Sequence, residues 1–183
     1  MVDEELTAMR FQFEAVPQEV GPWILVLLPE EASAQLSSRG MGMIQGELNG
    51  KPFQAPVEPD GRRGHWFRLT EPLMKTAGVS AGVPVQVSAQ PCEEWPDPEL
   101  PEDLEGALAS DAGAKEAWAE VTPKARWDWL RWVRSTNNAA TRQGRVDKAV
   151  SMLNAGKRRP CCFDRNRCTE MEVSKNGLLD VDL

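Results

Sequence analysis

The side chains best suited to acid–base or anion chemistry gather around a single histidine. His65 is the only histidine in a chain of 183 residues, and it directly follows Gly61-Arg62-Arg63-Gly64. An imidazole titrates near neutral pH, and guanidinium groups bind carboxylates and phosphates through forked N–H donors. We therefore predict a binding site for a small anionic ligand. The candidate ligand-binding residues are His65, Arg68, Arg62, Arg63 and Arg39.

The same residues allow two other interpretations. In one, His65 is the general acid or base of an enzyme. In the other, it is a structural histidine that forms a hydrogen bond at the rim of the fold. Because the chain has no tyrosine and one histidine, it offers no tyrosine acid and no metal site with two histidine ligands. We assign no catalytic residue and keep the enzyme as the alternative hypothesis.

Three of the four cysteines, Cys161, Cys162 and Cys168, lie close together near the C-terminus, and Cys92 is distant. Zinc sites use paired Cys-x2-Cys spacings, which this arrangement does not match. We predict reduced thiols, no metal and no cofactor. The sequence leaves open whether these thiols are reactive or structural.

A basic segment runs through the C-terminal half. Residues 123–167 contain twelve Lys and Arg against three Asp, whereas the whole chain has a net charge of -7. The segment predicts either a nucleic-acid surface or docking against an acidic surface, in the N-terminal half or on a partner protein. The negative net charge disfavours nucleic acid. The candidate partner-binding residues are Arg142, Arg145, Arg158, Arg159, Trp129 and Trp132.

These side chains must be positioned by two different halves, and the first has strand character. The expected strands cover 10–16, 23–28, 41–48, 51–57, 65–69 and 83–89, and the expected short helices cover 30–38 and 71–77. Asn49-Gly50 is typical of a type I′ hairpin. Alternation places His65 on the face shared by Phe67 and Leu69. We predict a small β-barrel over residues 8–90, of about six strands.

A proline-rich acidic stretch, 91–103, ends this pattern and predicts a linker. Helical periodicity follows over 104–156. Thr122 is the expected N-cap of a helix beginning at Pro123, and a last helix should run from Ala139 to Asn154 and end at Gly156. Residues 157–183 are expected to form an irregular tail. The fold class is therefore α+β, a barrel with a C-terminal helical appendage.

Both halves carry motifs of known families. Phe11 to Ala15, Trp23 to Pro29, Gly46 to Phe53, Gly64-His65 and the strand after Gly82 together resemble the barrel family called domain of unknown function 1905. The stretch Pro101 to Leu104, the Thr122-Pro123 helix start and Thr141 to Val146 resemble the bacteriocin-protection, YdeI/OmpD-associated family. The resemblance implies a non-enzymatic binding or stress-protection module of bacteria, and it transfers no catalytic residue.

The sequence also bears on location. The N-terminus is acidic and lacks the basic and apolar regions of a signal peptide, and the longest apolar run, Trp23 to Leu28, is too short to cross a bilayer. We expect a cytoplasmic protein without a membrane span. The identity of the ligand, the partner and the oligomeric state cannot be read from these patterns.

Overall fold

The computed structural model describes residues 10–161 and 163–182, which divide into two compact units. The barrel unit runs to Glu93 and also includes Arg165–Cys168 and the chain from Glu172 onward. The helical unit comprises Glu94–Asp164 and Thr169–Met171. The boundary after Glu93 falls inside the stretch that the prolines predicted as a linker. The two units are described separately below.

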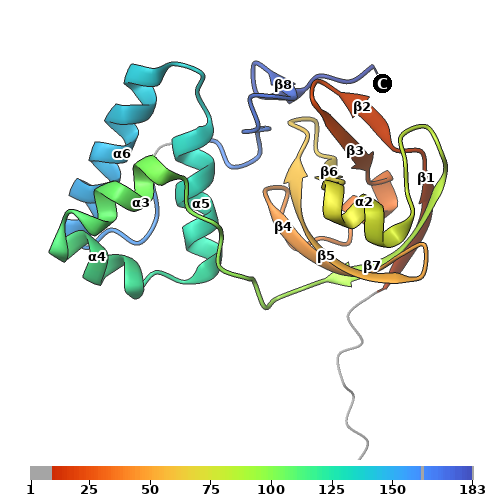
Figure 1. Cartoon of the computed structure of the whole chain (residues 1–183), viewed down its shortest axis with the longest axis horizontal. Coiled ribbons are helices and arrows are strands. Elements are labelled where there is room, and N and C mark those ends of the chain that lie inside the picture. Colours follow the sequence, from red (N-terminus) through yellow and green to blue (C-terminus); the bar gives the residue numbers. More distant parts are fainter. Residues whose placement is uncertain (1–9, 162, 183) are drawn as a thin grey trace, which may run out of the picture. The chain divides into compact units, whose positions relative to one another are not determined.

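The barrel unit is built on one curled antiparallel sheet (Figure 1). Its strands are β1 (Phe11–Ala15), β2 (Gln18–Val20), β3 (Trp23–Leu27), β4 (Gly42–Leu48), β5 (Lys51–Pro59), β6 (His65–Arg68) and β7 (Val85–Pro91). The spatial order is β1-β7-β4-β5-β6-β3-β2, with every pair antiparallel. Asn49 and Gly50, with φ of 49° and 76°, confirm the type I′ hairpin between β4 and β5.

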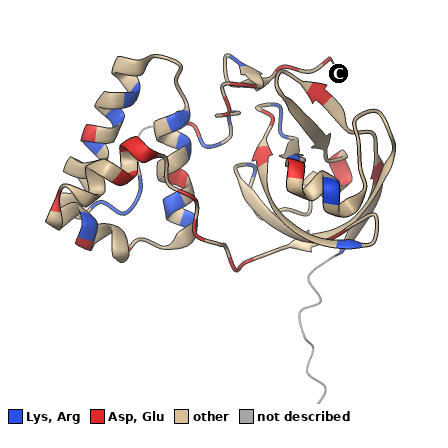
Figure 2. Cartoon of the chain, in the orientation of Figure 1, with Lys and Arg blue, Asp and Glu red and all other residues tan. Residues whose placement is uncertain are grey.

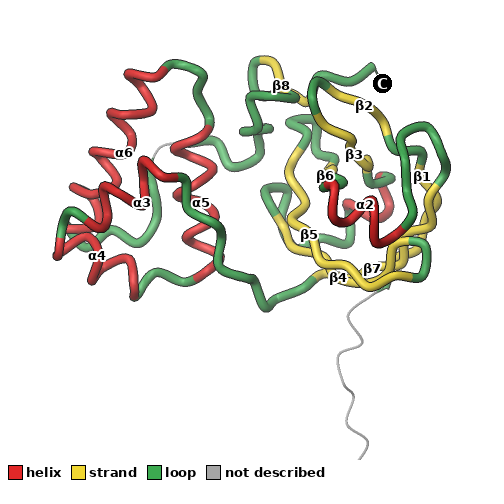
Figure 3. Tube along the Cα trace, viewed as in Figure 1, coloured by secondary structure: helices red, strands yellow, loops and turns green. Residues whose placement is uncertain are grey.

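The concave face of this sheet encloses the first core. Alternate residues of each strand, such as Ile44, Val57, Phe67 and Val87, are buried there. The short helix α1 (Glu30–Ser33) and helix α2 (Glu71–Ala77) cover this core, and α2 lies across the opening of the curled sheet (Figure 3). Burial of Phe67 and Leu69 on this face agrees with the alternation read from the sequence.

Two elements of the barrel unit differ from the sequence prediction. Strand β2 was not predicted, because it has only three residues and lies between two prolines, Pro17 and Pro22. It brings the sheet to seven strands instead of about six. Helix α1 ends at Ser33, whereas the prediction extended it to Ser38. The residues beyond it form turns that become one wall of the cavity described below.

The helical unit contains α3 (Glu102–Ala109), α4 (Ala112–Ala119), α5 (Pro123–Arg134) and α6 (Ala139–Asn154). Three helices begin at side-chain caps: Asp111, Thr122 and Asn138 each accept a hydrogen bond from a backbone N–H three residues later. The unit has its own core, which includes Leu104, Trp118, Trp129, Val133, Val146 and Leu153. The predicted starts at Pro123 and Ala139 are confirmed.

The tail expected to be irregular contains a small hairpin, β8 (Ser174–Lys175) and β9 (Leu178–Leu179). Asn176 and Gly177 join its strands with φ of 55° and 79°. The parts of the tail that belong to the barrel unit pack on its convex face, where Cys168, Val173 and Leu179 form a third core with Trp66 and other residues of the sheet. Trp66, on the opposite face of β6 from Phe67, is buried for this reason.

Candidate functional site

A cavity of about 810 Å³ opens in the barrel unit beside the start of β6. Two loops form its walls: the segment from α1 to Arg39, and the β5–β6 loop from Asp60 to Gly64. Three arginines line the cavity, Arg39, Arg62 and Arg63, together with His65. Two carboxylates, Glu30 and Asp60, also line it. The structure thus brings four of the five sequence-predicted ligand residues to one cavity.

The β5–β6 loop is held in a fixed shape by Asp60. One carboxylate oxygen of Asp60 accepts hydrogen bonds from the backbone N–H groups of Arg62 (2.6 Å) and Gly64 (2.9 Å). The backbone N–H of Asp60 donates to the Gly64 carbonyl at 3.0 Å. This carboxylate therefore serves the turn. Because Asp60 accepts from the backbone, it does not pair with the guanidinium groups of the loop; Arg62 donates to the Leu179 carbonyl instead, and Arg63 is exposed.

The α1–β4 segment is fastened to β6 by the histidine. The Nε2 atom of His65 lies 2.9 Å from the Gly40 carbonyl oxygen, to which it donates as the Nε2–H tautomer. His65 is 3% exposed, and burial lowers its pKa from 6.5, with the Gly40 carbonyl acting in the opposite direction. A neutral imidazole with Nε2 engaged and Nδ1 buried is a positioning group. This geometry gives no support to the acid–base alternative.

The cavity wall also contains a polar atom that the fold does not use. Ser33 is 7% exposed, and its buried hydroxyl has no hydrogen-bond partner among the residues that the structure describes. Buried hydroxyls are almost always hydrogen-bonded, to protein, water or ligand. Apolar side chains, including Leu28 and Leu36, complete the lining. The cavity can therefore accommodate an anionic group together with an apolar portion of the same molecule.

The fifth predicted residue, Arg68, lies elsewhere. Its guanidinium carbon is 4.2 Å from the centre of the Trp23 ring, and Arg68 does not line the cavity. The physical reason is strand alternation, since positions 66 and 68 point to the face opposite Phe67. The cavity therefore contains four of the five predicted ligand-binding residues and does not include Arg68.

The basic segment of the helical unit is largely paired within that unit. Figure 2 shows acidic residues on α3 and basic residues on α5 and α6. Six arginines form ion pairs there: Arg126–Asp97, Arg131–Asp128, Arg134–Glu170, Arg142–Asp103, Arg158–Glu120 and Arg159–Asp128. Arg145 donates to the Trp132 carbonyl and to the Ser135 hydroxyl. These contacts reduce the charge available to a polyanion.

The two tryptophans predicted to bind a partner are core residues instead. Trp129 is fully buried and Trp132 is 8% exposed, and their rings meet edge to face with centroids 6.0 Å apart. The Trp129 indole donates to the Arg158 carbonyl at 3.0 Å. Helical periodicity placed both residues on the apolar side of α5, which is the side that faces the core. Neither ring is available on the surface.

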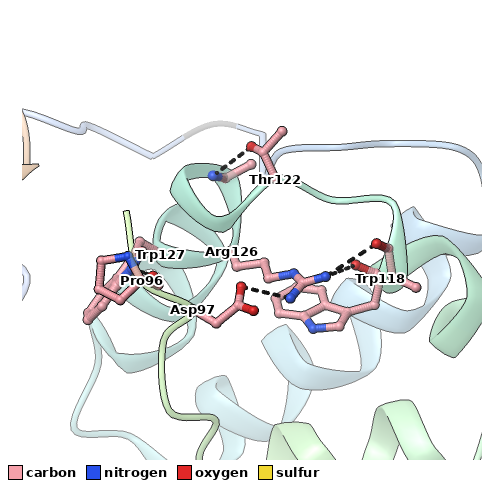
Figure 4. Close-up of polar contacts among 8 residues, drawn as sticks. Pro96, Asp97, Trp118, Thr122, Arg126 and Trp127 are labelled. Atoms are coloured by element: carbon pink, nitrogen blue, oxygen red, sulfur yellow. Dashed lines mark hydrogen bonds and ion pairs between the residues drawn. The ribbon is translucent and has the colours of Figure 1, made fainter. Parts of the chain in front are cut away.

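The proline-rich stretch is anchored to α5 (Figure 4). Arg126 pairs with Asp97 at 2.8 Å and donates to the carbonyl oxygens of Trp118 and Ala119. The Trp127 indole donates to the Pro96 carbonyl at 2.9 Å. Pro96 and Asp97, which lie in the predicted linker, therefore belong to the helical unit.

The thiols are dispersed between the units. Cys92 and Cys168 are buried in the barrel unit, and Cys161 is exposed in the helical unit. None of these three forms a disulfide bond within the described residues, and Cys162 lies outside them. Within the described chain, no group of three or more His, Cys, Asp or Glu side chains is placed to hold a metal ion.

Sequence reasoning missed one element that contacts the cavity-lining β5–β6 loop, the tail hairpin. The Leu179 N–H donates to the Asp60 carbonyl at 2.9 Å, and the Arg62 guanidinium donates back to the Leu179 carbonyl at 2.9 Å. A Cβ on Gly61 would overlap the Gly177 carbonyl oxygen. The Asn-Gly pair at 176–177 was the available signal, since it is the same hairpin signal that located the β4–β5 turn.

The protein thus combines two folded units: a curled antiparallel sheet with an arginine-lined cavity, and a helical unit with its own core. Comparison with family models agrees with this division. Residues 13–88 match the model described as Domain of unknown function (DUF1905), and residues 97–156 match Bacteriocin-protection, YdeI or OmpD-Associated (OmdA). The two matches follow one another along the chain in the order that its motifs indicated.

Two further findings accompany this assignment. A comparison with the curated proteins found no match. Among the described residues, no helix has both the length and the apolar character needed to span a membrane.

Proposed function

We propose that this protein is a non-enzymatic binding module whose barrel unit takes up a small organic anion. The observation that carries the proposal is the cavity walled by Arg39, Arg62 and Arg63. Each guanidinium offers forked N–H donors that match a carboxylate or a phosphate. Leu28 and Leu36 offer apolar contact for the remainder of such a molecule. We place this module in the bacterial cytoplasm, where it contributes to stress protection.

The protective role rests on the description of the second family, Bacteriocin-protection, which is matched by residues 97–156. In this proposal the barrel unit senses or sequesters the anion, and the helical unit contacts an acidic protein partner through basic residues of the segment that follows α6. The exposed Arg158 and Arg159, 48% and 45% exposed, are the candidates for that contact. A bacterial strain expressing the chain should survive a bacteriocin better than a strain expressing the Arg39→Ala/Arg63→Ala variant.

The binding proposal is tested by isothermal titration calorimetry with three probes, inorganic phosphate, phenyl phosphate and benzoate. The wild type should bind at least one of them, with an affinity that decreases between 50 and 200 mM salt, roughly within the range over which exposed charges are screened. Arg39→Ala should weaken this binding by about tenfold or more, because a charged hydrogen bond is lost. The matched control is Arg68→Ala, an exposed arginine outside the cavity, which should leave the affinity unchanged.

Two outcomes would contradict the proposal. One is that none of the three probes binds to the folded wild type. The other is equal weakening by Arg68→Ala and Arg39→Ala, which would assign the effect to overall charge. Gel-shift titrations with single-stranded and duplex DNA test the nucleic-acid alternative, and we expect no salt-sensitive binding because six arginines of the helical unit are paired.

A further inference from the structure

Arg63 combines an unusual backbone conformation with an unused side chain. Its φ is 78°, in the left-handed region that residues other than Gly, Asn and Asp rarely adopt. The other non-glycine residues with positive φ in the described chain are Asn49 and Asn176, both at Asn-Gly turns where this conformation is ordinary. Of these three residues, only Arg63 has a long side chain, and arginine does not favour the left-handed conformation.

The Arg63 side chain makes no polar contact with the described part of the fold. No hydrogen bond, ion pair or ring contact of this side chain exists within the described residues, and Arg63 is exposed. Its one structural association is with the cavity, which it lines beside Arg62 and His65. A glycine at position 63 would adopt the same backbone at lower cost. Strain that the fold does not need is a recognised sign of a functional position.

The surroundings hold the strained conformation in place. Asp60 binds the backbone N–H groups on both sides of Arg63, those of Arg62 and Gly64. The tail hairpin also holds the loop, through the hydrogen bonds between Leu179 and the Asp60–Arg62 segment. Conformations of this kind persist where neighbouring contacts determine the backbone more strongly than the strained residue does. The loop therefore keeps a fixed shape with the Arg63 side chain at the cavity.

We propose that Arg63 is the principal anchor for the ligand, that its left-handed backbone is maintained for this purpose, and that the ligand class is a phosphate monoester carrying a small apolar group. This inference rests on the proposed function. Three arginines line the cavity, one of which, Arg62, also donates to the Leu179 carbonyl, against Glu30 and an Asp60 carboxylate that accepts two backbone N–H bonds. A phosphate monoester carries close to two negative charges and three acceptor oxygens, so it uses more of these donors than a carboxylate does.

The test uses the full chain and compares variants at position 63 in phenyl phosphate binding and in thermal unfolding. Arg63→Gly should raise the Tm by about 2–4 °C, because the strain is relieved and no contact is lost. The same variant should lose at least about tenfold in affinity for phenyl phosphate. Arg63→Lys, which keeps a charge but also the strain, should retain more affinity than Arg63→Gly and show no rise in Tm. Wild-type protein should prefer phenyl phosphate to benzoate.

The matched control is Asn176→Gly, which introduces glycine at another left-handed position outside the cavity lining and should leave phenyl phosphate binding unchanged. A Tm that falls in Arg63→Gly would overturn the inference, since the side chain would then serve the fold. Unchanged affinity in a stabilised Arg63→Gly would also overturn it. A wild type that binds benzoate better than phenyl phosphate overturns the ligand class alone. A wild type that binds none of the probes instead refutes the proposed function.

Discussion

Arg142 and Asp103 form a two-pronged ion pair that joins the start of α3 to the first turns of α6. The Nε and Nη2 atoms of Arg142 lie 2.7 and 3.1 Å from the two carboxylate oxygens of Asp103. The same carboxylate accepts from the Leu104 N–H at 2.9 Å, at the first turn of α3. The pair connects two motifs of the helical family, Pro101 to Leu104 and Thr141 to Val146. The ion pair therefore fastens the start of α3 to α6.

Replacing this carboxylate should weaken the helical unit in a pH-dependent way. The Arg142 guanidinium lowers the pKa of Asp103 below 3.8. Its contribution is therefore present above pH 3.8 and lost as the pH falls through the folded pKa. Asp103→Asn should lower the free energy of unfolding by about 1–2 kcal/mol at pH 7, since both side chains are about one-third exposed. Tryptophan fluorescence during urea unfolding measures this change.

The control for that experiment is Glu120→Gln, which removes the partner of Arg158. This pair is far more exposed, at 48% and 67%, and should contribute at most about 1 kcal/mol. A loss of stability in Asp103→Asn no larger than in Glu120→Gln would show that the two-pronged geometry adds nothing.

His65 should titrate below its ordinary range. Because burial lowers its pKa from 6.5, the unfolded chain binds the proton more tightly than the folded one. The free energy of unfolding should then fall by up to about 1.4 kcal/mol for each pH unit below 6.5, until the folded pKa is reached. Since the chain has one histidine, its imidazole NMR signal can be followed without assignment. His65→Gln should abolish this part of the pH dependence, and a folded-state pKa at or above 6.5 would contradict the burial argument.

Local patterns predicted the elements because each carries its own signal. The Asn49-Gly50 turn, the Thr122 cap and the alternation of β6 are all decided by residues next to one another in the chain. The cavity was partly predictable for the same reason, since Arg62, Arg63 and His65 are consecutive or nearly so. Arg39 joins them only because the Gly40 carbonyl binds His65 across 25 positions of sequence.

The contributions that could not be predicted depend on long-range packing. Nothing near Leu179 indicates that it would form hydrogen bonds with the Asp60 loop 119 positions earlier in the chain. The strands β8 and β9 have two residues each, too few to show alternation. The exposure of Trp129 and Trp132 was misjudged, because tryptophan among arginines suggests a binding surface until the core of the helical unit is known.

Two glycines should respond in opposite ways to replacement by alanine. A Cβ at Gly46 in β4 would overlap the Ser88 carbonyl oxygen of the adjacent β7 backbone, which cannot move without distorting the sheet. Gly46→Ala should destabilise the barrel unit by about 3 kcal/mol. Gly144 lies within α6 with open space around its Cβ position, so Gly144→Ala should stabilise the helical unit by about 0.5–1 kcal/mol. Thermal unfolding of both variants checks the signs, and a neutral Gly46→Ala would refute the close strand contact.

Exposed and buried cysteines should differ in the rate at which a thiol reagent labels them. In a Cys162→Ser variant, exposed Cys161 should react with a thiol reagent at once, and Cys92 and Cys168 should react only as the barrel unit opens. Under denaturing conditions without reductant, all four wild-type thiols should react, as expected for reduced, metal-free cysteines. Stoichiometric zinc that is lost on replacing Cys161 and Cys168 would overturn this prediction.

Limited proteolysis should begin near the boundary between the units, and one arginine should decide how far the cutting extends. We expect the first cuts between Pro91 and Asp103, with exposed Glu93 and Glu94 the preferred sites of a glutamate-specific protease. Arg126→Ala removes the ion pair between Asp97 and α5 and the hydrogen bonds from α5 to the end of α4, so cutting after Glu99 should accelerate severalfold.

The matched control for this proteolysis is Lys148→Ala, an exposed basic residue on α6, which should leave the cutting rates unchanged. Mass spectrometry of the early fragments identifies the sites. If Arg126→Ala leaves the rate after Glu99 at the wild-type level, the contacts of Trp127 with Pro96 and of Lys124 with the Trp95 ring hold the segment without the arginine. If the first cuts instead fall between residues 20 and 90, the division of the chain at this stretch is wrong.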